Sequence, residues 1–409
     1  MAEFRADPAY VAGLGNAVGE IGRDNQRIAA FIGEHGAPGE FYSGPIIAAL
    51  MNPLKEFAEA AEARMLDIAD VNIWTSVELN KAAWMYYDQE AQNYAALNAH
   101  TGHLGGDSYA SGPATEMQGI TEGYGGAESF PKPEEIKLDP PAANKEDLAA
   151  LISEASGWLG DVNEAIKNST RMAGMEWDAL GSVLSPITGN WNELVRIGES
   201  HKIAGNAFEV SARNMADGMR RVSDEWDGKA AASFDEHAGR QREAMAWEGP
   251  VGRTVAVGLG MAAERIRQAI ITVISKLEEL LESQVSFDGV LDTVKFWAKK
   301  IPVVGTTAQM AALGRIIWKV ADMVLALVDE IREMVDRIKE FLSAVTNPIG
   351  KAHGKLDDRL SPITSKIDDY TRRTAFTEDL KKVNNYDSTF NRPKEAFEVG
   401  AGKDPWADG

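Results

Sequence analysis

The stretch WNELVRIGESHKIAGNAFEVSARNMADGMRRVSDEWDGKAAASF (191–234) decides the fold class. Its apolar side chains recur every three or four residues as far as Val222, which is the period of an α-helix. The pattern stops at Trp226-Asp227-Gly228, where glycine can take a positive φ and reverse the chain. The small residues that follow let a second helix start close to the first, and Trp226 and Phe234 can cover the turn with apolar area. The stretch therefore predicts a helical hairpin that turns at residues 226–228.

The N-terminal part predicts another hairpin of this kind. Asp7-Pro8 is a helix N-cap followed by proline at the first helical position, and an apolar stripe continues from there to Gly33. Residues 35–45 have the composition of a turn. A long helix is expected from about residue 46 to residue 98, with a kink at Pro53. Two such stripes joined by a short loop indicate an antiparallel pair.

The connecting segments differ from the hairpins in composition. Residues 101–143 are rich in Gly, Pro and Ser and show no apolar periodicity, so we expect a mobile connector with no apolar face to bury. Helical periodicity continues from 251 to 345 as three stretches, with breaks near 286–289 and at Pro302. The last residues, about 384–409, are expected to be loosely ordered.

These patterns predict an all-α fold, in which long antiparallel helical hairpins pack as an elongated bundle and an extra apolar helical region follows. The expected parts are an N-terminal hairpin (1–98), a Gly/Pro-rich linker (99–146), a second hairpin module (147–285), C-terminal amphipathic helices (286–346) and a polar, partly disordered tail (347–409).

Composition argues against several classes of partner. Lys and Arg total 42 against 62 Asp and Glu, which gives a net charge of −20, and no basic run exceeds two residues. Counterion release from nucleic acid needs clustered cations, so nucleic acid is not an expected partner. The chain has no cysteine, which excludes disulfides, thiolate metal sites and cysteine nucleophiles. The first residues lack the basic and apolar regions of a Sec signal peptide.

Membrane contact stays open as an expectation. The best candidate for a membrane span, residues 303–328, carries Arg315, Lys319 and Asp322 on one helical face. A spanning helix needs about 18 consecutive residues without charge. The segment is therefore interpreted as an amphipathic helix.

No catalytic pattern emerges, and we expect a protein that is not an enzyme and needs no metal or cofactor. Gly258-x-Gly260-x-x-Ala263 resembles a dinucleotide-binding loop, but that motif follows a strand, whereas helical periodicity surrounds this one. Its glycines are interpreted as sites of close helix packing. His100 and His103 are near each other, yet no carboxylate cluster accompanies them.

The turn carries a family resemblance. The sequence SDEWDGKAAASFDEH (223–237) resembles the hairpin turn of the WxG family, the helical-hairpin proteins exported by actinobacterial ESX (type VII) secretion systems. ITGNWNELVRIGE (187–199) is similar to the first helix of WxG modules in larger substrates. AAWMYYDQEAQNYAAL (82–97) resembles the helix end at which EspC-like and EspB-like substrates place the export signal Y-x-x-x-D/E.

The resemblance implies specific site residues. The export signal corresponds to Tyr86 and Glu90, and the W-x-G turn to Trp226 and Gly228. Helical context favours Tyr86 over a second match in the linker. The predicted geometry brings the four residues together on one exposed patch that a secretion ATPase could read. The other matches to these short patterns are Tyr124 to Glu128, Trp158-x-Gly160 and Trp247-x-Gly249.

By this resemblance, the function expected is that of a non-enzymatic substrate of an ESX system, secreted or held at the cell surface, which self-assembles. A signal-bearing hairpin before a W-x-G hairpin is the order of EspB-like substrates, although the apolar region 251–345 is additional here. The expected partners are the ESX ATPase and machinery, further copies of the chain and a helical chaperone. Two alternatives are a membrane-active or pore-forming protein that uses helices 254–345, and the delivery part of a toxin.

Overall fold

The protein is described by a computed structural model at residues 5–39, 44–87, 124–142, 148–156, 159, 160, 164, 179–283, 307–346, 364, 367, 370–384, 393 and 397. The helices are α1 (Pro8–His35), α2 (Pro45–Tyr87), α5 (Leu148–Ala155), α7 (Ala179–Leu184), α8 (Trp191–Val222), α9 (Lys229–Glu282), α11 (Thr307–Thr346) and α13 (Tyr370–Asn384). Within these residues there is no strand, only an isolated bridge between Ala6 and Trp226. The prediction of an all-α fold is confirmed.

The first helix pair is α1 with α2. The Asp7 side chain accepts a hydrogen bond of 2.9 Å from the backbone of Ala9 and so caps α1, with Pro8 at its first position. Gly15 lies against Asn80 and Gly22 against Ile73. Because residue numbers rise on one helix as they fall on the other, the helices are antiparallel. Helix α2 continues through Pro53, and its predicted extension to residue 98 lies outside the described residues.

The second pair is α8 with α9, and it is also antiparallel. A Cβ atom on Gly205 would lie 2.4 Å from the carbonyl oxygen of Glu248, and one on Gly252 would lie 2.2 Å from that of His201. No larger residue fits at such a close approach of two backbones. Helix α9 has 54 residues and passes through Pro250. The expectation of a new helical stretch from 251 is therefore wrong, since packing of the flanking turns against α8 outweighs the lost hydrogen bond at the proline.

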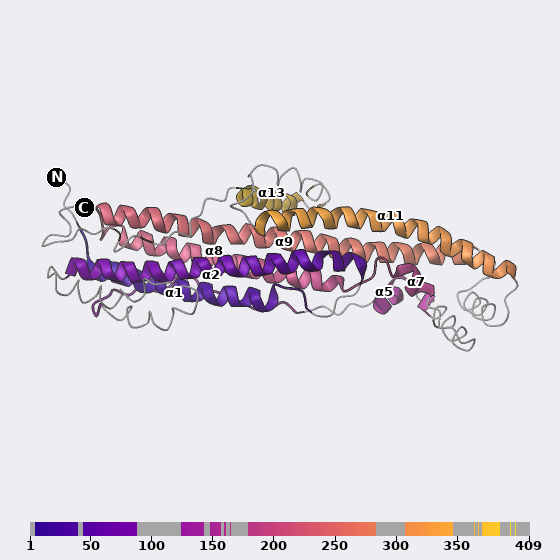
Figure 1. Cartoon of the computed structure of the whole chain (residues 1–409), viewed down its shortest axis with the longest axis horizontal. Coiled ribbons are helices and arrows are strands. Elements are labelled where there is room, and N and C mark those ends of the chain that lie inside the picture. Colours follow the sequence, from indigo (N-terminus) through magenta and orange to yellow (C-terminus); the bar gives the residue numbers. More distant parts are fainter. Residues whose placement is uncertain are drawn as a thin grey trace.

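The two pairs join side by side into an elongated bundle, with α1 packed on α8, and α11 lying along α9 and α2 (Figure 1). The apolar stripe of α11, which includes Val320, Val324, Val328 and Ile331, is buried in this packing. Among the described helices, none combines the length and the apolar composition that crossing a bilayer requires.

Part of the linker packs on the bundle, which corrects the expectation of a connector without an apolar face. Residues 124–142 are extended, and we call this segment the strap. Phe130 packs edge-on against Tyr10 of α1, and Ile136 and Leu138 lie on the core. Asn214 of α8 hydrogen-bonds both the backbone N–H and the carbonyl of Glu134 in the strap. Alternate side chains of the strap face the bundle, a period of two that helical analysis does not detect.

The C-terminal part is also more structured than predicted. Helix α13 lies on α9 (Figure 1), with Phe376, Leu380 and Val383 buried against the bundle. Farther along the chain, Phe397 is fully buried. Part of the predicted polar tail therefore packs on the bundle, because Phe376, Leu380 and Val383 recur on one face of α13.

Candidate functional site

The W-x-G turn forms the closed end of the second helix pair, at the left end of the bundle in Figure 1. Gly228 has a φ of 88°, the left-handed conformation that the sequence predicts for this glycine. The N-terminal chain pairs with the turn in antiparallel fashion: the Asp227 N–H donates to the Arg5 carbonyl at 2.9 Å, and the Asp7 N–H donates to the Glu225 carbonyl at 2.8 Å. The turn is therefore held by the residues that lead into α1.

Tyr86 and Trp226 meet at this end. The indole Nε1–H of Trp226 donates a hydrogen bond of 3.1 Å to the phenol oxygen of Tyr86, and their ring centroids are 6.4 Å apart, edge to face. Burial raises the pKa of Tyr86, the indole N–H lowers it in part, and Asp227 raises it again. Tyr86 is therefore a neutral phenol that accepts from the indole. Two residues 140 positions apart, which the resemblance puts in one signal, are in direct contact.

The predicted exposure of the indole is wrong. Trp226 is only 3% exposed, because Phe234 stacks on it at 5.5 Å and Phe397 lies across it at 6.4 Å. We call this enclosure of Trp226 by Tyr86, Phe234 and Phe397 the aromatic socket. The carboxylate partner of the predicted signal, Glu90, lies outside the described residues.

A second group of rings lies on the helix that carries Tyr86. Trp84, Tyr87 and Tyr124 contact one another edge-on, with centroids between 5.4 and 6.0 Å apart. Tyr87 is 63% exposed, so this group, unlike the socket, presents an aromatic surface. Tyr124, the first residue of the second Y-x-x-x-E match, therefore contacts Tyr87, which is the neighbour of Tyr86 in the sequence. Tyr124 belongs to the predicted linker, and only the packing of the strap brings it into contact with Trp84 and Tyr87.

The other short matches have no such context. Trp247 lies within α9, where its Nε1–H donates to the carbonyl of Val383 at 3.1 Å, so Trp247-x-Gly249 forms no turn. Gly258 and Gly260 also lie within α9. A Cβ on Gly258 would lie 3.6 Å from Ile338 of α11, an ordinary contact, and a Cβ on Gly260 would meet nothing. The expected close helix packing is therefore wrong for both glycines. Trp158, His100 and His103 lie outside the described residues.

The bundle interior contains one pair that resembles a nucleophile and its base. Thr75 Oγ1 and His237 Nε2 are 2.9 Å apart, and the same hydroxyl donates to the carbonyl of Val71 at 2.8 Å. Because the hydroxyl proton is engaged there, His237 must donate through Nε2, and a nitrogen that carries a proton cannot act as the base. Burial lowers the pKa of His237 to about 4, with a further lowering by Arg240, so the ring is neutral. The pair is a structural contact.

Metal ligands are not assembled in the described part of the chain, where no three His, Asp or Glu side chains form a group that could hold an ion. No family model, no curated protein sequence and no solved structure matches the chain.

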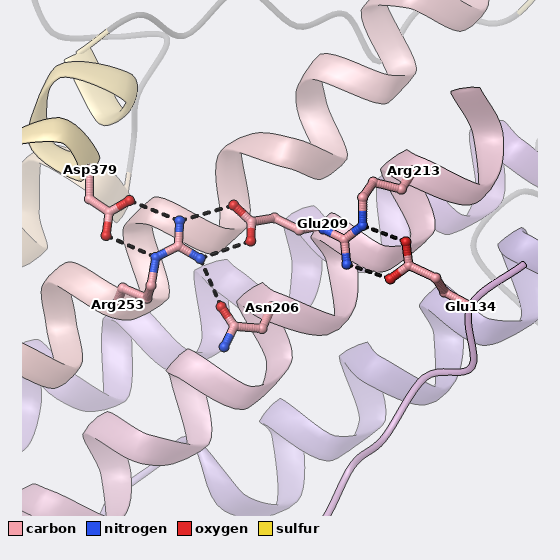
Figure 2. A network of polar contacts seen from close by, with 6 residues as sticks. All are labelled: Glu134, Asn206, Glu209, Arg213, Arg253 and Asp379. Carbon is pink, nitrogen blue, oxygen red and sulfur yellow. Dashed lines mark hydrogen bonds and ion pairs between the residues drawn. The ribbon is translucent and has the colours of Figure 1, made fainter. Parts of the chain in front are cut away.

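Ion pairs link the strap and the tail helix to the body of the bundle (Figure 2). Arg253 of α9 lies between two carboxylates, bonding Glu209 of α8 at 2.8 and 2.9 Å and Asp379 of α13 at 2.8 Å twice. Hydrogen bonding to Asp379 raises the pKa of Arg253. One helical turn from Glu209, Arg213 bonds both oxygens of Glu134 in the strap at 2.7 Å. The hydrogen bond from Arg213 lowers the pKa of that carboxyl group.

Proposed function

We propose that this chain is a substrate of an ESX (type VII) secretion system and that Tyr86, Glu90, Trp226 and Gly228 belong to its export signal. The observation that carries the proposal is the hydrogen bond between Trp226 and Tyr86. Each of these motifs is short enough to occur by chance. A direct contact between the Y-x-x-x-E motif at Tyr86 and the W-x-G motif at Trp226, at the end of the bundle, is a stronger reason to treat them as one site.

The burial of Trp226 changes the role proposed for it. A ring that is 3% exposed offers no surface to a partner, so its role in this site is that of a positioning residue, which fixes the phenol of Tyr86 from behind. The secretion ATPase would then contact Tyr86, the Glu90 carboxylate and the exposed Tyr87. A secreted or surface location, self-assembly, a helical chaperone and the lack of enzymatic activity are further parts of the same proposal.

The test is export from an actinobacterial host that carries an ESX system, measured as the fraction of the protein in the culture filtrate. Tyr86→Ala and Glu90→Gln are expected to abolish export while the intracellular level stays normal. Glu128→Gln is the matched control, because it changes the carboxylate of the second Y-x-x-x-E match, and it is expected to be exported like the unchanged protein. Normal export of both Tyr86→Ala and Glu90→Gln would overturn the proposal.

Tyr86→Phe tests the positioning role of Trp226. It retains the ring and removes only the oxygen that accepts from the indole, which leaves the buried Nε1–H without its acceptor. We expect a loss of about 1 kcal/mol in the free energy of unfolding, together with reduced export at a normal intracellular level. Full export despite that loss of stability would show that the hydrogen bond has no part in recognition.

A further inference from the structure

Three polar contacts connect α2 of the first helix pair to the segment that runs from the W-x-G turn into α9 of the second. They are Arg64 with Glu248 at 2.6 and 3.1 Å, Thr75 with His237 at 2.9 Å, and Tyr86 with Trp226 at 3.1 Å. We call this set the ladder and each contact a rung. The contact that carries the proposed function is thus the last of three rungs between the same two segments.

The rungs are evenly spaced on both sides of the ladder. On α2 they lie at residues 64, 75 and 86, and on the opposite segment at 248, 237 and 226, so every step is 11 residues. Eleven residues make about three turns of an α-helix, which returns a side chain to nearly the same face about 17 Å farther along. Since the steps are equal and run in opposite directions, two antiparallel segments that meet at one rung also meet at the others.

The rungs differ in chemistry, so a change of register does not restore them. If α9 moved along α2 by one turn, Arg64 would face a residue three or four positions from Glu248, which means Ala244, Met245, Val251 or Gly252. A move by a whole step would place His237 or Leu259 there. None of these carries a negative charge. The side chains of Arg64 and Glu248 are only 7% and 2% exposed, and separation of a buried charge from its partner disfavours such a state about 100-fold or more.

A layer of polar contacts between the first two rungs includes the other two helices. Asn25 of α1 and Asn72 of α2 both donate to the sulfur of Met245 on α9, at 3.3 and 3.5 Å. Ser211 of α8 donates to the side-chain oxygen of Asn25 at 2.6 Å. All four side chains are buried. One helix from each side of each pair therefore takes part, and a move of one pair along the other would break these bonds together.

We propose that the ladder sets the register in which α1 and α2 pack on α8 and α9, and that its rungs at Arg64 and Thr75 thereby position Tyr86 against Trp226. Apolar burial has no preferred direction, whereas polar residues in an apolar interface specify register. Arg64, Thr75 and their partners are positioning residues for a contact 11 and 22 residues away. The setting of register concerns the fold alone, whereas its consequence for export rests on the proposed function.

Distances between two nitroxide spin labels test the ladder in the full chain, which has no cysteine of its own. Lys55→Cys on α2 and Glu236→Cys on α9 carry the labels that report the register between the two pairs. Both side chains are exposed, at 67% and 68%. Lys55 lies 20 residues before Thr75, which is level with His237, so the labels are offset by about 30 Å along the bundle.

A second pair of labels, Val195→Cys with Glu236→Cys, reports α8 against α9 alone. Val195 is 40% exposed and lies ten residues before Gly205, which faces Glu248. The offset is about 33 Å, close to that of the first pair of labels. This distance is expected to stay the same in every ladder variant, because no rung joins α8 to α9.

Two variants remove rungs. Arg64→Met/Glu248→Met removes the first, and the addition of Thr75→Val/His237→Leu removes the second as well. We expect a second distance between the labels at 55 and 236, displaced by about 5 Å, which is one turn. It should appear in about a tenth or more of the molecules, since the preference of about 100-fold for one register is lost, and the fourfold variant should show more of it.

The matched control is Ser200→Ala/Thr254→Val. It also removes buried hydroxyl groups, but that of Ser200 bonds its own helix and that of Thr254 has no partner, so neither joins the two pairs. Only the native distance is expected here. A single native distance in both ladder variants would overturn the proposal, because apolar packing would then set the register. If the fourfold variant lost its helicity, the double variant would decide.

Export separates the ladder from the proposed function. The fourfold variant is expected to lose export in proportion to the share of molecules with the displaced distance, at a normal intracellular level. A displaced distance with full export would leave the ladder standing and remove the alignment of Tyr86 with Trp226 from the export signal. An undisplaced distance would overturn the ladder whatever the level of export.

Discussion

Two arginines of this protein make the same contact in different surroundings. Arg64 of α2 bonds both carboxylate oxygens of Glu248 on α9 at 2.6 and 3.1 Å, and Arg213 of α8 bonds both oxygens of Glu134 in the strap at 2.7 Å. The side chains of the first pair are 7% and 2% exposed, and those of the second are 53% and 42% exposed. Both arginines bond the two carboxylate oxygens through Nε and Nη2, but the first pair is shielded from water and the second is not.

The difference shows which polar contacts fix the bundle. An exposed ion pair is screened by water and stabilises a protein by at most about 1 kcal/mol. A buried pair adds little over apolar residues, yet loss of one partner leaves a buried charge that destabilises by about 3–5 kcal/mol. Arg64 also donates to the carbonyl of Val345 on α11 and lies 5.0 Å from the Trp247 ring. The interior pair thereby connects α2, α9 and α11 in one arrangement.

The largest effect is expected from Glu248→Gln, which retains the shape of the side chain and removes its charge. The buried charge of Arg64 would lose the carboxylate that pairs with it, so the free energy of unfolding should fall by about 3–5 kcal/mol, as measured by chemical denaturation. The double change Arg64→Met/Glu248→Met should recover most of this loss, because it removes both charges together. If Glu248→Gln lowered the free energy of unfolding by less than about 1 kcal/mol, water would have to reach the ion pair. The pairs of Arg64 and Arg213 would then not differ in their contribution to stability.

A buried histidine sharpens the same contrast by pH. His201 of α8 packs on Phe57 at 4.7 Å, and its Nε2 lies 3.1 Å from the carbonyl of Gly36. Burial lowers the pKa of His201 to about 4, the backbone hydrogen bond to Gly36 raises it in part, and the charges of Arg64 and Arg196 lower it further. The ring is therefore neutral in the folded protein at neutral pH.

The sign of the pH effect follows from the depressed pKa of this base. The unfolded chain binds a proton at His201 near pH 6.5, whereas the folded chain does so only near pH 4. Stability is complete above pH 6.5 and falls between pH 6.5 and 4, by about 1.4 kcal/mol per pH unit and about 3 kcal/mol in total for this group. His201→Gln should remove about 1.4 kcal/mol per pH unit from the slope of unfolding free energy against pH in this range, while His237, whose pKa is also lowered to about 4, keeps its own share. An equally steep curve in the variant would assign the effect to other groups.

The smallest effect is expected at the surface. Glu134→Gln removes the charge that pairs with Arg213, but both side chains stay in contact with water. The free energy of unfolding should change by no more than about 0.5 kcal/mol, and 1 M salt should remove the difference. Glu135→Gln, an exposed neighbour in the strap, is the control. If Glu134→Gln lowered the free energy of unfolding about as much as Glu248→Gln, the strap would be fixed by this ion pair. Burial would then not explain the difference expected between the ion pairs of Arg64 and Arg213.

Features that depend on neighbouring residues could be predicted from the sequence. The cap at Asp7, the turn at Gly228 and the start of α9 at Lys229 all follow from local backbone chemistry and helical period. The choice of Tyr86 as a partner for Trp226 came from a family resemblance and from helix length. The bond between their side chains agrees with that choice, while the role of the two residues in export stays a prediction.

The packing of the strap and of the tail could not be predicted from helical period or from local backbone chemistry. In the strap, half-buried and exposed side chains alternate along an extended chain that contains Pro131 and Pro133, so the strap shows no helical period. In the tail, Phe397 is one of four aromatic residues between 384 and 409, and no pattern of apolar residues marks it as the buried one. The continuity of α9 through Pro250 was missed for the opposite reason, because a local rule was applied where packing decided.

The sequence by itself determined that the chain is helical, where most of the helices begin and end, and where the second hairpin turns, because these features depend on the period of apolar residues and on the φ of single glycines and prolines. Only the tertiary structure decided that Trp226 is enclosed, that Tyr86 is its acceptor, and that the strap and Phe397 pack on the bundle. The contact between Tyr86 and Trp226 joins residues 140 positions apart, and the contact between Trp226 and Phe397 joins residues 171 positions apart. Burial of this kind depends on which surfaces meet, and that is a property of the folded chain as a whole.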